Sequence, residues 1–81
     1  MKINAKFLCR EVVGQARNGE YEIPDGADIA EFMRIAAEEN GTFVKNYPDF
    51  AIYVVNNAPA VPETVLHEGD RLMALMRIYG G

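Results

Sequence analysis

The chain has 81 residues, a formal net charge of −4 at pH 7 and a hydrophobic fraction of 49%. We expect one domain spanning residues 1–81, because a chain of this length buries a single small core. The acidic balance, with no basic stripe to neutralise phosphates, argues against a nucleic-acid partner. No apolar run approaches the roughly 18 residues of a membrane span. Because the N-terminus also lacks a signal-peptide pattern, we predict a cytoplasmic protein with no membrane partner.

Residues 2–23 predict two strands. Apolar and polar side chains alternate over residues 2–8 and again over residues 20–23, as in strands with one buried face. Gly14, Asn18 and Gly19 mark the connection between them. We therefore expect an antiparallel hairpin.

The clearest helix begins after Asp28. The Asp28 side chain is placed to cap free backbone N–H groups, and Glu31 completes a capping-box pattern. Asn40 and Gly41 end the helix with residues that tolerate a left-handed conformation. Four apolar residues fall on one helical face and are assigned to the core: Ile29, Phe32, Met33 and Ala36.

The next segment, residues 51–55, is continuously apolar, which predicts a central strand buried on both faces. Pro59 and Pro62 argue against a regular element in the segment that follows. We expect Val65 and Leu66 to hold that loop against the core. Cys9 is the only cysteine and His67 the only histidine, and we interpret them as a structural thiol and a solvated side chain. A lone cysteine offers no thiolate cluster, so no metal site is expected.

Residues 71–78 predict the last strand. Met73 and Leu75 lie on one face of it, and exposed apolar side chains of this kind mark partner contacts. The alternative is that another element covers both residues. The opposite face is assigned to the core by its alternating apolar residues: Leu72, Ala74, Met76 and Ile78.

The chain ends in Tyr79, Gly80 and Gly81. Two glycines make a thin, flexible tether, and its only reactive group is the α-carboxylate, which is ionised at neutral pH. Such a tail is suited to threading a narrow channel into a partner's active site. The alternative is a frayed terminus without a role.

The order of the predicted elements suggests a β-grasp fold of the α+β class. We expect a mixed sheet of four or five strands, with one main helix on one face and the first and last strands parallel neighbours. Five segments carry a resemblance to the small subunit of molybdopterin synthase and to the sulfur carrier of thiamine biosynthesis. They are Lys2–Gly14, Glu22–Ala27, Val54–Asn57, Thr64–Leu72 and the terminal Gly80–Gly81.

This resemblance implies a sulfur carrier that is not itself an enzyme and binds no cofactor. A ubiquitin-activating-type enzyme would use ATP to adenylate the Gly81 carboxylate, and sulfur from a persulfide would then replace AMP to leave a thiocarboxylate. Gly80 would act as a spacer. The acceptor would be a synthase subunit in molybdenum- or tungsten-cofactor (molybdopterin) biosynthesis. Residues of the last strand and tail are the candidates for partner binding: Met73, Leu75, Arg77 and Tyr79.

Other functions fit the same residues. The sulfur could serve thiamine or another pathway, and a ubiquitin-like modifier would instead join the Gly81 carboxylate to lysines as an amide. A plain β-grasp binding module would make no use of the two glycines. Whichever holds, the net acidic charge predicts attraction to a basic docking surface.

Overall fold

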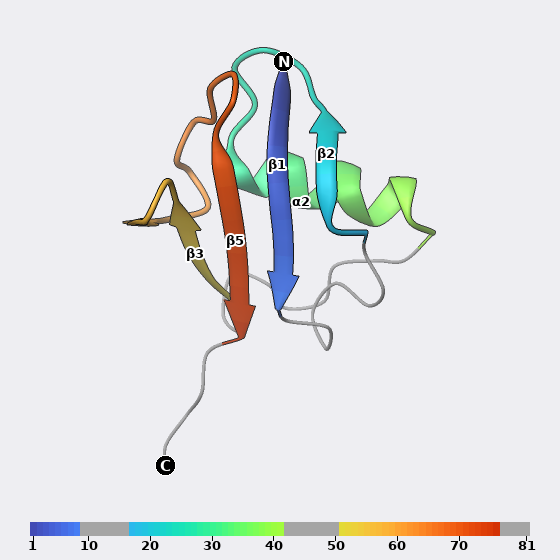
Figure 1. The fold of residues 1–81 in the computed structure, drawn as a ribbon. Coiled ribbons are helices and arrows are strands. Elements are labelled where there is room, and N and C mark those ends of the chain that lie inside the picture. Colours follow the sequence, from blue (N-terminus) through green and yellow to red (C-terminus); the bar gives the residue numbers. More distant parts are fainter. Residues whose placement is uncertain (9–16, 42–50, 77–81) are drawn as a thin grey trace.

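The computed structural model describes residues 1–8, 17–41 and 51–76. In this part of the chain a five-stranded mixed sheet lies against one helix, with the strand order β2-β1-β5-β3-β4 (Figure 1). The elements are β1 (Lys2–Leu8), β2 (Gly19–Glu22), α2 (Ile29–Glu39), β3 (Ala51–Val55), β4 (Ala58–Ala60) and β5 (Arg71–Met76).

The centre of the sheet is formed by β1 and β5, which run parallel to each other. Strand β2 pairs antiparallel with β1, and β3 pairs antiparallel with both β5 and β4. The predicted first hairpin, the parallel central pair and the five-stranded mixed sheet with its helix are therefore confirmed.

Both ends of α2 have the expected caps. The Asp28 side chain accepts a hydrogen bond from the Glu31 N–H at 2.8 Å, which satisfies one of the free donors of the first turn. The Glu31 carboxylate itself binds Arg34 at 2.8 Å rather than completing the capping box. Hydrogen bonding from Arg34 is the main cause that lowers the pKa of Glu31. At the other end Gly41 has φ = +68°, the left-handed conformation typical of a residue that ends a helix.

The loop before β5 completes the start of the helix. The carbonyls of Thr64 and Pro62 accept hydrogen bonds from the N–H groups of Ile29 and Ala30, both at 3.0 Å. The side chain of Leu66, in the same loop, is 1% exposed. The segment between β4 and β5 therefore fixes the helix to the sheet, although it forms no helix or strand itself.

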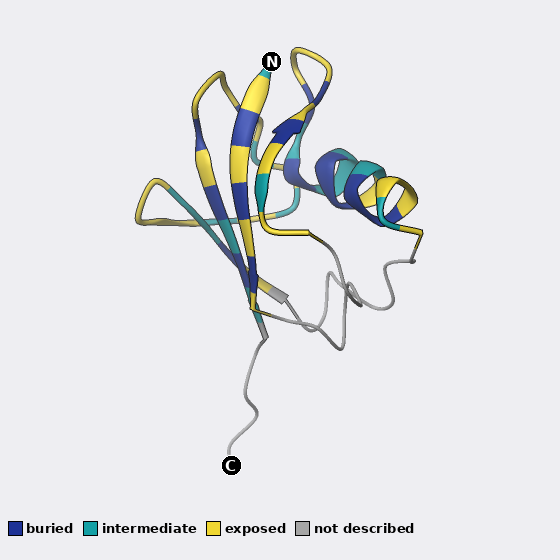
Figure 2. Ribbon diagram, turned by 45° about the vertical axis from the view of Figure 1, so that its right-hand side comes forward, coloured by how far each residue is buried: buried dark blue, intermediate teal, exposed yellow. Residues whose placement is uncertain are grey.

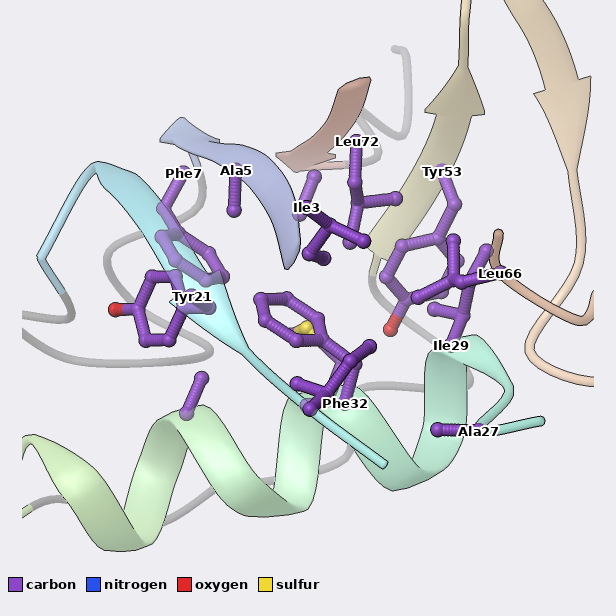
Figure 3. Close-up of a cluster of buried hydrophobic side chains, with 14 residues drawn as sticks. Ile3, Ala5, Phe7, Tyr21, Ala27, Ile29, Phe32, Tyr53, Leu66 and Leu72 are labelled. Atoms are coloured by element: carbon purple, nitrogen blue, oxygen red, sulfur yellow. The ribbon is translucent and has the colours of Figure 1, made fainter. Parts of the chain in front are cut away.

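The core lies between the sheet and α2 and is built around aromatic rings (Figure 3). Phe32 of the helix stacks on Phe7 of β1 with ring centroids 6.0 Å apart, and meets Tyr21 of β2 edge-on at 5.2 Å. All four predicted core residues of the helix are buried, as are Leu72 and Ala74 of β5. The predicted core positions Met76 and Ile78 cannot be compared, because the side chain of Met76 and residue 78 lie outside the described part of the chain.

Three expectations about the second half of the chain are wrong. Strand β3 is buried on one face only, since Ile52 is 40% exposed on the other. A short strand, β4, does form around Pro59; it pairs with β3 and lies at the edge of the sheet, where a proline is tolerated. Val65 is 47% exposed, so Leu66 alone of the two residues packs into the core.

Candidate surface for partner binding

The candidate site is the face of the sheet opposite α2. Figure 2 shows the helix on one side of the strands, and no described element covers the other side. Burial alternates along β1 and along the first part of β5, so every second side chain points away from the core. We call this surface the outer face. On β1, β5 and β3 it consists of Lys2, Asn4, Lys6, Leu8, Ile52, Val54, Arg71, Met73 and Leu75.

One end of the outer face is apolar. The strand register places Leu75 between Leu8 on β1 and Ile52 on β3. Leu8 is 50% exposed and Ile52 is 40% exposed, whereas Leu75 in the middle is half-buried by them. One step along the strands, Met73 lies beside Val54. This apolar end is at the C-terminal end of β5, where the chain continues into residues 77–81.

The structure therefore brings two of the predicted partner-binding residues together. Met73 and Leu75 lie on the outer face, as predicted, and each is half-buried rather than fully covered. Arg77, Tyr79 and the terminal glycines Gly80 and Gly81 lie outside the described residues.

Three apolar residues of this surface were missed by sequence reasoning: Leu8, Ile52 and Val54. Leu8 could have been found, because alternation in the first strand places it on the same exposed face as Lys2 and Lys6 although it is apolar. Ile52 and Val54 carried none, since a continuous apolar run does not reveal which of its side chains face outward.

The middle of the outer face contains a pocket of about 350 Å³. Two cations, three asparagine residues and the apolar residues around Met73 line it. The lining side chains of the outer face and of the turn after β3 are Asn4, Lys6, Val54, Asn56, Asn57, Arg71 and Met73.

A polar network around the nearly buried Asp70 holds one wall of this pocket. The Asn56 side chain accepts a hydrogen bond from the Arg71 N–H and donates one to the Asp70 carboxylate, both at 2.9 Å. The other Asp70 oxygen accepts from the His67 N–H at 2.8 Å. Asp70 is 9% exposed, so these donors replace the water that its charge would otherwise require. The side chain of His67 is 78% exposed, which agrees with its interpretation as a solvated residue.

The described residues hold no cluster of metal ligands. Within them, no three His, Cys, Asp or Glu side chains are grouped so as to hold a metal ion. The helix that the structure describes is too short and too polar to cross a membrane. Cys9 lies outside the described residues, and the outer face presents exposed cations and partly exposed apolar side chains.

The parallel central pair, the five-stranded mixed sheet and the helix across one face define a β-grasp, ubiquitin-like fold. Among solved structures, the chain is similar to SAMP1 from Haloferax volcanii, with 16% identity over 100% of both chains and a TM-score of 0.62. It is also similar to a Pyrococcus furiosus protein assigned as molybdopterin converting factor, subunit 1, with 20% identity, a TM-score of 0.63, and coverage of 96% of this chain and 99% of that one.

A third similar structure is Urm1 from Trypanosoma brucei, with 16% identity, a TM-score of 0.62, and coverage of 99% of this chain and 95% of that one. No protein-family model and no curated protein matches the sequence. At these identities the likeness establishes the fold.

Proposed function

We propose that this protein is a sulfur carrier in which Gly81 bears the sulfur as a C-terminal thiocarboxylate. The observation that carries the proposal is a β-grasp domain whose central strand β5 leads, five residues after Met76, to a terminal Gly80–Gly81. The fold shared with SAMP1, Urm1 and molybdopterin converting factor subunit 1 supports it. By the same resemblance, the acceptor is a synthase subunit that makes molybdopterin.

The chemistry explains why such a carrier needs a partner. A carboxylate is a poor electrophile, because its negative charge repels nucleophiles and oxide is a poor leaving group. One oxygen of the Gly81 carboxylate attacks the α-phosphorus of ATP and displaces pyrophosphate. A persulfide sulfur then attacks the carbonyl carbon and AMP leaves. A second thiol cleaves the S–S bond of the resulting acyl disulfide, which leaves the thiocarboxylate and a new disulfide.

The carrier itself supplies the tether and the docking surface, and the partner supplies the catalysis. Five residues, 77–81, span at most about 17 Å when fully extended. A partner that binds the outer face must therefore hold its adenylating site within that distance of the end of β5. Glycine at positions 80 and 81 lets the tail pass through a channel too narrow for side chains.

The outer face is the surface on which we expect the adenylating enzyme to dock. Leu8, Ile52, Met73 and Leu75 form an apolar area next to the start of the tail, and apolar patches rimmed by polar residues are typical of protein contacts. The adenylation step consumes ATP, which fits a cytoplasmic location, and ATP and the persulfide are substrates of the partner rather than cofactors of this chain.

Incubation with the adenylating enzyme of the source organism, ATP and a persulfide donor tests this function. We expect the intact mass to rise by the difference between a sulfur and an oxygen atom, and only when ATP is present. A chain that lacks Gly81 should fold normally and show no change, because the reacting carboxylate is displaced. An unchanged mass of the full chain, with an enzyme that is active on its own carrier, would contradict the proposal. Amide links to lysines would indicate a modifier instead.

A further inference from the structure

The positively charged groups of the described residues fall into two sets. In the first set each cation contacts a carboxylate of the same chain. The amino terminus lies 3.3 Å from Asp25 and 3.8 Å from Glu22. The first set also includes the pair Arg17–Glu39 and the helix pairs of Arg34 with Glu31 and Glu38.

The second set consists of Lys2, Lys6 and Arg71, whose side chains make no ion pair with any described residue. All three are exposed and all three belong to the outer face. Glu20 and Glu22 lie on the edge strand β2, and β1 separates them from Arg71. The Glu68 carboxylate, in the turn before β5, accepts a hydrogen bond from the Lys2 N–H at 2.9 Å. The Asp70 carboxylate is already bound by the Asn56 side chain and the His67 N–H. The cations that folding leaves unpaired are thus gathered on the surface that we propose for docking.

Two of these cations share the pocket of the outer face. Lys6 is the neighbour of Met73 across the parallel pair, and Arg71 lies two residues earlier on β5. Strand spacing and rise per residue therefore put their Cα atoms about 8 Å apart. Both line the pocket, together with Asn4, Asn56 and other residues, none of which carries a carboxylate. A site with two cations, amide groups and no anion is complementary to a negatively charged group.

The apolar end of the outer face also limits what kind of partner can bind there. The centre of the pocket lies about three residues along β5 from Leu75, which corresponds to about 10 Å. A small anion would leave Leu8, Leu75 and Ile52 uncovered, whereas a protein surface can cover the pocket and the apolar side chains together.

We infer that the pocket receives a carboxylate side chain of the adenylating enzyme, next to an apolar side chain that covers Leu8, Leu75 and Ile52. This inference rests on the proposed function and specifies which group of the adenylating enzyme contacts the outer face. It reverses the expectation, made from net charge alone, that the partner's docking surface is basic. The whole chain is acidic at −4, but charges beyond a Debye length of about 8 Å are screened at physiological salt, so the partner responds to the local cations.

The test uses the enzyme's ATP–pyrophosphate exchange, which reports adenylation of the carrier and allows KM to be separated from kcat. The variant is Lys6→Gln combined with Arg71→Gln. The matched control is Arg34→Gln, which removes an exposed cation of α2 on the opposite side of the sheet from the outer face. All these residues are exposed, so thermal unfolding of each variant should remain close to that of the unmodified chain.

For the double variant we expect the KM for the carrier to rise about tenfold with kcat unchanged, because neutralised docking charges weaken encounter and binding rather than the reaction. Arg34→Gln should change the KM less than about twofold, because α2 lies on the other side of the sheet. Added salt should raise the KM of the unmodified chain and leave that of the double variant nearly constant. An unchanged or lower KM in the double variant would overturn the inference.

Two further outcomes keep this inference separate from the proposed function. If the unmodified chain supports no exchange, the proposed function itself fails. If inorganic phosphate or ATP alone, added to the free carrier, saturates shifts of the Lys6 and Arg71 amide signals at millimolar concentration, the pocket binds a small anion and the inference of a partner carboxylate fails.

Discussion

Leu72 and Leu75 are three residues apart on β5 and lie on opposite faces of the sheet. Leu72 is 2% exposed and belongs to the core beneath α2. Leu75 is half-buried on the outer face, between Leu8 and Ile52. Because side chains alternate along a strand, the same residue type serves stability at one position and is available to a partner at the other.

Alanine at these two positions should separate the two roles. Leu72→Ala removes fully buried methyl groups and should lower the free energy of unfolding by about 2–5 kcal/mol. Leu75→Ala should cost about 1 kcal/mol or less, because its side chain is already partly hydrated. Urea unfolding followed by circular dichroism gives both values. Leu75→Glu should also weaken docking on the adenylating enzyme while the protein stays folded. An equal loss of stability at both positions would show that Leu75 belongs to the core.

At the scale of elements, the hairpin of β3 and β4 is positioned by its turn. Asn56 and Asn57 have φ = +51° and +69°, the left-handed conformation at both central residues that a two-residue hairpin turn requires. Asn56 additionally binds the Arg71 N–H and the Asp70 carboxylate. The turn is thereby tied to the start of β5, and these hydrogen bonds hold one wall of the outer-face pocket.

This difference between two adjacent asparagines is testable. Glycine adopts positive φ without strain, so Asn56→Gly and Asn57→Gly have the same effect on the backbone. They differ because only Asn56→Gly removes the side-chain hydrogen bonds to Asp70 and Arg71. We expect Asn56→Gly to be less stable than Asn57→Gly by about 2 kcal/mol, since one oxygen of the nearly buried Asp70 then loses its donor. The two variants are compared by the midpoints of their urea unfolding curves, which give the stability difference when both curves have the same m-value. Equal midpoints would mean that the Asn56 side chain does not hold the turn.

At the scale of the whole molecule, the sequence predicted the elements that have their own local signals. Alternation over residues 2–8 specified β1 and its buried face. Asp28 and Gly41 mark the two ends of α2, because capping is a local effect that a sequence displays directly. The parallel neighbours β1 and β5 came from the order of elements together with the family resemblance.

The features that depend on how the strands pair, such as the neighbours of Leu75 and the outer-face pocket, were not predictable from the sequence. Which residue lies beside Leu75 is decided by the register of two other strands, and no single segment encodes that register. The same holds for the pocket, whose walls come from β1, β3, β5 and the turn after β3. Strand β4 was missed because a proline is unfavourable inside a sheet and acceptable at its edge, and the sequence does not show which strand is the edge.

The proposed function requires that the Gly81 carboxylate become a thiocarboxylate in the cell. The most direct measurement is mass spectrometry of the C-terminal peptide of the protein isolated from its own cells. Trypsin cleaves after Arg77 and releases residues 78–81. We expect a fraction of this peptide to carry sulfur in place of one oxygen at Gly81. If the peptide is found solely as the free carboxylate in cells that are making molybdopterin, Gly81 does not carry sulfur and the proposed function is wrong.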